Sequence, residues 1–174
     1  MNANTPRLLV LLGAIVAAAA LRLVPHPPNF TPIDAMALFS AAYLGRRVLA
    51  FAAPLGALLL SDLVLGFYHG IATVYASVAL IVLVGWIALS RVSPLRVGAA
   101  AIAGSLLFFV ITNFGMWLFS GFYPPTTAGL AACYVAAIPF FQNTVAGDLF
   151  YSAVLFGGFA LLERTVPTLR TQPA

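Results

Sequence analysis

Long apolar runs separated by short polar loops are the feature that most limits what this chain can fold into. Hydrophobic residues make up 63% of the chain and charged residues only 7%, whereas a soluble domain carries about 25% charged residues. One soluble core cannot hide this much apolar surface. The runs also lack the two-residue alternation of a transmembrane barrel. The sequence therefore predicts an all-α membrane protein. It excludes a soluble enzyme, a disordered chain and, with one cysteine, a disulfide scaffold.

The predicted architecture is a single transmembrane domain, residues 1–174, built as a bundle of six helices. The expected spans are 8–24, 33–44, 48–68, 71–90, 97–119 and 140–162. The second span is short, because a bilayer core takes about 20 residues of helix. A short helix over 128–138 precedes the last span, and Pro139 is expected to interrupt the chain between them. A secretory signal peptide is the alternative for the first run.

The eight arginines orient this bundle. With a cytoplasmic N-terminus and six crossings, Arg22 alone falls outside. The others fall on the cytoplasmic side: Arg7, Arg46, Arg47, Arg91, Arg96, Arg164 and Arg170. Such a bias is what the positive-inside rule describes. We therefore expect a multi-pass protein of the bacterial inner (cytoplasmic) membrane with both termini cytoplasmic.

Polar side chains inside the spans gather near the outer face of the predicted bundle. Asp62 and Asn113 each lie about 9 Å below the outer ends of their helices, and Asp148 lies about 12 Å down. A charge at this depth costs several kcal/mol unless it faces a cavity or a partner. The sequence therefore predicts one outward substrate cavity. Its expected lining residues are Asp62, Asn113, Gln142, Asn143 and Asp148.

Several of these residues also have structural interpretations. Asp34 follows Thr31 and Pro32 in a variant of the helix-capping pattern, so we interpret it as part of a helix start. Asp62 could instead form an ion pair with Arg22. The two asparagines, 113 and 143, could join helices by hydrogen bonds. Asp148 has no arginine at its own depth, which makes it the strongest candidate for a functional carboxylate.

Two proline-rich loops, 25–32 and 121–127, are expected to pack together and cap the cavity from outside. The sequence contains no phosphate-binding loop, nucleophile elbow or diagnostic metal-ligand spacing. It also lacks a basic stripe suited to nucleic acid. We therefore predict no enzymatic activity, no catalytic residue, no cofactor, no metal and no nucleic-acid partner.

Three strings carry a resemblance over nearly the whole chain: PPNFTPIDAMALF at 27–39, FFVITNFGMW at 108–117 and IPFFQNT at 138–144. With them the chain resembles a family of small bacterial membrane proteins of unknown function. The layout is also loosely similar to the substrate-binding S components of energy-coupling factor transporters. That likeness implies an outward cavity, a transmembrane coupling subunit and two ATPases as partners. It also implies docking through small residues of the first helix, here Ala14, Ala17 and Ala18.

From these features we expect a substrate-binding membrane subunit for uptake of a small polar or cationic solute. Its partners would be the lipid bilayer, the small-molecule substrate and energy-supplying subunits. One alternative is a structural or assembly subunit of a membrane complex, in which the polar residues join helices. Another is a stand-alone cation-coupled carrier that uses Asp62 and Asp148, although the sequence shows no internal repeat.

Overall fold

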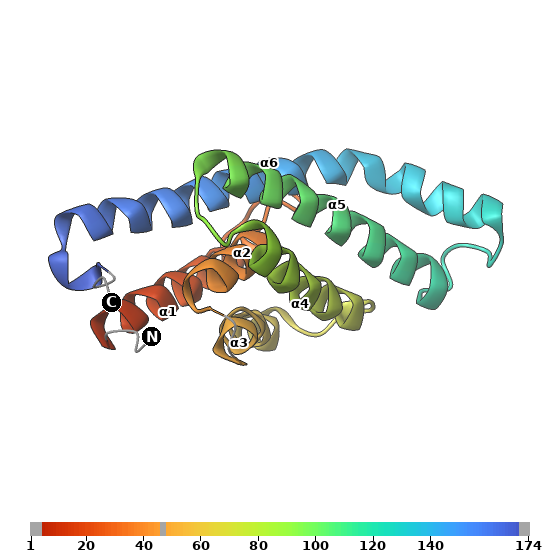
Figure 1. The fold of residues 1–174 in the computed structure, drawn as a ribbon. Coiled ribbons are helices and arrows are strands. Elements are labelled where there is room, and N and C mark those ends of the chain that lie inside the picture. Colours follow the sequence, from red (N-terminus) through yellow and green to blue (C-terminus); the bar gives the residue numbers. More distant parts are fainter. Residues whose placement is uncertain (1–4, 46–47, 171–174) are drawn as a thin grey trace.

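The computed structural model describes residues 5–45 and 48–170, and this part of the chain forms an all-helical bundle (Figure 1). The helices are α1 (Thr5–Ala20), α2 (Ile33–Tyr43), α3 (Val48–Leu65), α4 (Ile71–Ala88), α5 (Pro94–Phe119) and α6 (Thr127–Thr165). Two short 3-10 helices, η1 (Leu21–Leu23) and η2 (Pro167–Leu169), follow α1 and α6. Five of the helices are long and apolar enough to cross a membrane, and α2 is the short sixth. The predicted fold class is confirmed.

Helix α2 occupies the centre of the bundle and packs against all the other helices, α1 and α3–α6. Every residue from Ile33 to Ala41 is buried. A helix that is apolar all round is expected to lie inside a structure in this way. Because α2 rises only about 16 Å over its 11 residues, it starts well inside the bundle. The residues in its first turn are therefore buried too.

Helices α5 and α6 form a long antiparallel hairpin, and α6 runs through Pro139 without a break. The predicted interruption between 128–138 and 140–162 is wrong. Phe109 of α5 packs against Tyr134 and Phe141, with ring centroids 5.5 and 4.8 Å apart, and so contacts α6 on both sides of the proline. The Tyr134 hydroxyl also donates to the Val110 carbonyl at 2.7 Å. Membrane helices tolerate proline where a neighbouring helix compensates in this way.

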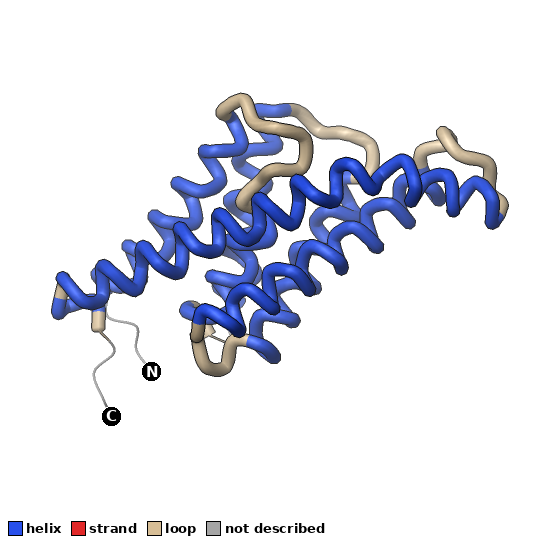
Figure 2. The backbone as a smooth tube through the Cα atoms, turned by 90° about the horizontal axis from the view of Figure 1, so that it is seen from above, coloured by secondary structure: helices blue, strands red, loops and turns tan. Residues whose placement is uncertain are grey.

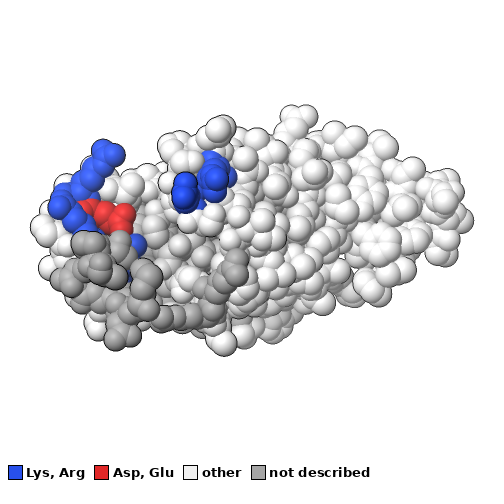
Figure 3. All heavy atoms as spheres, in the orientation of Figure 1, with Lys and Arg blue, Asp and Glu red and all other residues white. Residues whose placement is uncertain are grey.

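The charged side chains visible in Figure 3 lie toward one end of the molecule, which we call the terminal end because α1 begins and α6 ends there. On the face shown in Figure 3, the rest of the surface carries no charge. Arg91, Arg96, Arg164 and Arg170 are exposed there. Arg46 and Arg47 lie outside the described residues. We use the term cavity end for the part of the bundle where η1 leads to α2 and α3 leads to α4; the tip of the α5–α6 hairpin extends beyond it (Figure 2).

The small-residue face expected on α1 is only partly exposed. Ala17 is exposed and Ala14 is half-buried, but Ala18 is only 5% exposed. Leu11, Ile15 and Ala18 recur at the spacing of one helix face, and this face packs inward on the core. The expected exposure of Ala18 is therefore wrong.

Candidate functional site

A cavity of about 370 Å³ opens at the cavity end of the bundle. It is built by η1, the segment before α2, the α3–α4 loop and the facing sides of α2, α4, α5 and α6. The lining residues are Arg22, His26, Asn29, Thr31, Ile33, Asp34, Tyr68, His69, Gly70, Val74, Phe108, Phe109, Thr112, Asn113, Met116, Ala137, Phe140, Thr144 and Asp148. His26, Asn29, Tyr68 and His69 are exposed and form the rim, whereas Asp34, Thr144 and Asp148 are buried and form the floor.

Two carboxyl groups meet at the floor. Asp34 and Asp148 are each only 2% exposed, and both line this cavity. The Ser105 hydroxyl of α5 lies 2.5 Å from Asp148 Oδ2. Neither oxygen of Asp34 accepts a hydrogen bond from a donor within residues 5–45 and 48–170. The floor is thus acidic, and no arginine among the described residues pairs with either carboxyl group.

The segment before α2 reaches Asp148 because it packs directly along α6. Gly147 makes this possible, since a Cβ there would lie 3.1 Å from both the Cα of Phe30 and the backbone nitrogen of Thr31. Asn143 donates to the Pro28 carbonyl at 3.0 Å. The Phe30 ring packs on Phe150 and Tyr151, at 5.8 and 5.5 Å between centroids. These contacts place the start of α2, and with it Asp34, against the middle of α6.

The third aspartate belongs to a separate site. Asp62 Oδ1 lies 2.8 Å from Arg22 Nη1, and Asp62 Oδ2 accepts from the Tyr75 hydroxyl at 3.0 Å. Arg22 also donates to the Ser61 hydroxyl and, at 3.4 Å, to the Leu58 carbonyl. Asp62 is fully buried and does not line the cavity, although Arg22 does. The prediction that Asp62 lines the cavity is therefore wrong, and the ion-pair alternative is confirmed.

The predicted amides have three different positions. Asn113 lines the cavity, and its side-chain nitrogen donates to the Phe109 carbonyl at 2.7 Å. Asn143 lies outside the lining and holds the segment before α2. Gln142 is exposed on α6 and does not reach the cavity. The expected positions of Gln142 and Asn143 in the cavity wall are wrong, because neither shares a helix face with Asp148.

Asp34 is the residue that the sequence interpretation missed. The structure places Pro32 at the helix start with no side-chain capping bond, and the Asp34 carboxyl faces the cavity instead. The apolar residues that follow Asp34 could have revealed its burial. A helix that is apolar on all sides is expected to lie inside the bundle, and an acid in its first turn is then buried with it. Thr144 was missed as well, although it lies four residues before Asp148 on the same face of α6.

The rim also differs from the expectation. The loop 25–32 borders the cavity, but the loop 121–127 contributes no residue to it. Figure 2 shows the first loop over the middle of the bundle and the second at the far end of the α5–α6 hairpin. There Trp117 donates to the Pro124 carbonyl at 3.0 Å and keeps that loop on α5. The expectation that the two loops pack together is wrong, and Tyr68 and His69 form the second side of the rim.

Tyr68 stands at this rim beside the Arg22–Asp62 pair. Its partial burial, followed by the negative charge of Asp62, raises the pKa of the Tyr68 phenol. The phenol is therefore neutral at physiological pH and adds no charge to the rim.

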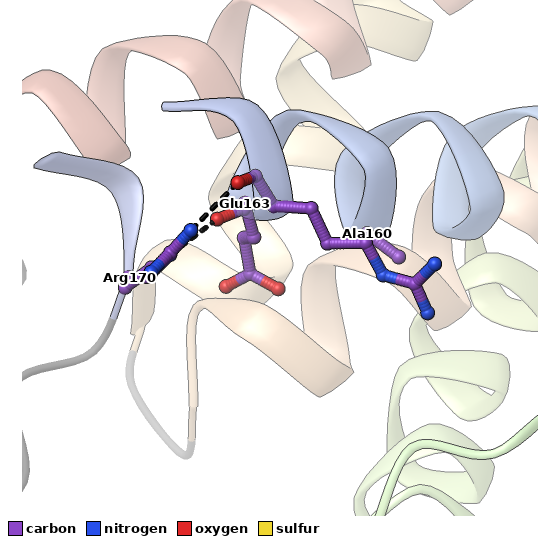
Figure 4. Close-up of a pocket in the computed structure, with 4 residues that line it drawn as sticks. Ala160, Glu163 and Arg170 are labelled. Carbon is purple, nitrogen blue, oxygen red and sulfur yellow. Dashed lines mark hydrogen bonds between the residues drawn. The ribbon is translucent and has the colours of Figure 1, made fainter. Parts of the chain in front are cut away.

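A second hollow lies at the terminal end and is lined by Ala160, Glu163, Arg164 and Arg170 (Figure 4). Arg170 turns back to donate to the carbonyls of Glu163 and Arg164, at 2.8 and 2.6 Å. It thereby satisfies carbonyls that the end of α6 leaves without helical partners. The buried Arg7 pairs with Glu163. The polar residues of this hollow therefore have structural roles, because their hydrogen bonds and ion pair hold the end of α6 against α1.

An aromatic cluster fills the bundle between the cavity and these contacts. Phe39 packs edge-on against Phe156 and Phe159, at 5.3 and 5.7 Å. Tyr43 adds a contact to Phe159 at 4.7 Å. The Arg7 guanidinium carbon lies 5.0 Å from the Phe159 ring centre. The cavity is therefore closed toward the terminal end.

The comparison with protein families adds one finding. A model described as a family of unknown function (DUF6580) matches residues 2–169. The chain belongs to the DUF6580 family. No curated protein and no solved structure matches it. Within the described parts of this DUF6580 member, no group of three or more His, Cys, Asp or Glu side chains could hold a metal ion.

Proposed function

We propose that this protein binds a small organic cation in the cavity and serves its uptake across the membrane. The observation that carries the proposal is the burial of Asp34 and Asp148 in one cavity, where neither pairs with a positively charged residue of the described part of the chain. Two carboxylates at membrane depth are strongly unfavourable unless a cation or a proton compensates them. A positively charged ligand would compensate them directly.

The walls of the cavity favour an organic cation over a bare metal ion. Phe108, Phe109 and Phe140 line it together with Met116. Aromatic faces attract cations, and apolar side chains bind the carbon groups of an organic ion. A volume of about 370 Å³ lies within the range of small-molecule pockets.

The charge distribution supports uptake as the direction. Exposed arginines gather at the terminal end, which the positive-inside bias favours as the cytoplasmic side. The cavity would then open outward, and the aromatic cluster would close it inward. In this proposal a coupling subunit and ATPases supply energy, as in the S components that the layout resembles. A stand-alone cation-coupled carrier is the alternative arrangement.

The test uses purified protein in lipid nanodiscs and a pair of probes of equal shape. Choline is compared with 3,3-dimethylbutan-1-ol, in which carbon replaces the charged nitrogen; methylammonium and guanidinium extend the panel. At a concentration 100 times its dissociation constant, a ligand stabilises the folded state by about 2.7 kcal/mol. We expect thermal stabilisation by at least one cation and none by the neutral alcohol. Equal shifts for choline and the alcohol, or no shift with any cation, would contradict the proposal.

A further inference from the structure

We propose that Asp34 and Asp148 share one proton in the empty site and that the bound cation replaces it. The site would then exchange a cation for a proton. This inference rests on the proposed function and adds the species that occupies the floor when no cation is bound. The burial of both carboxyl groups in one cavity carries it, because neither is paired with an arginine among the described residues and two ionised carboxylates there would need a compensating charge.

Electrostatics favour one proton at this floor. Two like charges held close together in a poorly hydrated interior repel each other strongly. Asp34 and Asp148 are each only 2% exposed, so water screens their charges poorly. One protonated carboxyl can donate to the other, which removes the repulsion and satisfies both groups.

Hydrogen bonding suggests which carboxyl carries the proton. The Ser105 hydroxyl donates a hydrogen bond to Asp148 Oδ2 at 2.5 Å, and such a bond stabilises the anionic form of that carboxyl group. Asp34 has no such donor among the described residues. Asp34 is therefore the proton carrier and Asp148 the anion. The Ser105 hydroxyl can also reach the Ala101 carbonyl at 3.0 Å, so it can turn away when Asp148 becomes protonated.

Within residues 5–45 and 48–170, no neighbouring residue supplies the missing positive charge. Arg22 is paired with Asp62, whose other oxygen is bound by Tyr75. His26, Tyr68 and His69 lie at the exposed rim rather than at the floor. On α6 the nearest titratable group is Tyr151, and the α5 residues of the lining are not titratable. The floor thus depends on a proton or a ligand for compensation.

The exchange leaves the buried charge unchanged. With one proton the two carboxyl groups carry a net charge of about −1; with a monovalent cation and no proton, the total is again about −1. The O–H bond of Asp34 breaks, its electron pair stays on the carboxylate, and the proton leaves through the rim to water. Neither occupant adds charge at membrane depth, so each can replace the other at low electrostatic cost.

The first measurement counts protons on the unmodified protein. Choline binding in nanodiscs is followed by titration calorimetry at pH 7 in two buffers with different ionisation enthalpies. We expect release of about one proton per cation, and an apparent affinity that rises about tenfold per pH unit while the site holds its proton. Binding without proton release would overturn the exchange and leave the proposed function intact.

The second measurement needs no ligand. The chain has only four acidic side chains, and Asp62 and Glu163 are paired with arginines. An infrared carbonyl band of a protonated carboxylic acid in nanodisc samples should therefore report the Asp34–Asp148 pair. We expect the band in the unmodified protein, its loss in Asp34→Asn and its retention in Gly158→Ala. Absence of the band from the unmodified protein would overturn the shared proton. Presence of the band without binding of any cation in the panel would contradict the proposed function alone.

Discussion

The bundle buries two acidic sites, and they differ in what neutralises them. At one, Asp62 forms an ion pair with Arg22 and accepts a hydrogen bond from the Tyr75 hydroxyl, so its charge is compensated within the protein. At the other, Asp34 and Asp148 both line the floor of a cavity, and Asp34 has no donor in the described parts of the chain. Burial of an aspartate is therefore not a sign of function by itself. The missing counter-charge is what marks the second site.

The difference follows from how each site is assembled. Arg22 lies in η1, directly after α1, and meets Ser61 and Asp62 in the last turns of α3. At the other site, α2 starts inside the bundle and α6 passes it without adding a basic residue. Irregular backbone at membrane depth is tolerated where it lines a cavity, and the segment before α2 does so. The first site stabilises the bundle, and the second is open to a ligand.

The largest effect is expected from breaking the satisfied site. Arg22→Met leaves Asp62 buried without a cation, and we expect a loss of about 3–5 kcal/mol of unfolding free energy. Denaturant unfolding of the purified protein measures it. The double variant Arg22→Met/Asp62→Asn removes both charges and should recover part of the loss. A single-variant loss below about 1 kcal/mol would show that the pair is not buried as described.

A substitution at the Asp34–Asp148 site should change ligand affinity more than it changes the free energy of unfolding. Asp148→Asn keeps the shape of the side chain and a partner for Ser105, so we expect stability to change by less than about 1 kcal/mol. Choline affinity should fall about 30-fold or more, because one of two buried counter-charges is lost. The same change at Asp62 should mainly lower stability, since it leaves Arg22 unpaired. If both variants lose stability and binding alike, the two sites do not differ in role and the structural alternative holds.

A smaller effect tests how the open site is held together. In Gly147→Ala the new methyl group must push the segment around Phe30 away from α6, which moves Asp34 from Asp148. We expect a loss of about 1–3 kcal/mol in stability together with weaker choline binding. Gly157→Ala is the matched control. Gly157 lies on the same helix, α6, and a Cβ added there would meet no atom within 4 Å. Equal behaviour of the two variants in thermal unfolding would contradict the close approach.

Much of this comparison could be predicted from the sequence, but not all of it. The apolar runs predict the helices, and the lack of an arginine near Asp148 singles out that acid. The pairing of Asp62 with Arg22 remained one of two alternatives, because depth along a helix does not specify the direction of a side chain. The residues before Asp34 predict a helix cap, whereas the apolar residues after it predict a buried helix. The structure shows burial, and the Asp34 carboxyl group lines the cavity. Pro139 continues a helix because α5 packs on both sides of it, which is a tertiary effect.

The smallest expected effect concerns Asn143, where sequence and structure assign different roles. The sequence predicts a residue that binds the ligand, whereas the structure shows a donor to the Pro28 carbonyl at 3.0 Å, outside the cavity. Asn143→Ala should cost about 0.5–1.5 kcal/mol in stability, the usual contribution of one hydrogen bond. Choline affinity should fall by only a few-fold, because the segment that carries Asp34 keeps its packing on Gly147 and Tyr151. Gln142→Ala is the neighbouring comparison, since that side chain is exposed and should change neither quantity. A loss of choline binding in Asn143→Ala as large as that in Asp148→Asn would restore the direct role, and the cavity wall would then have to include this face of α6.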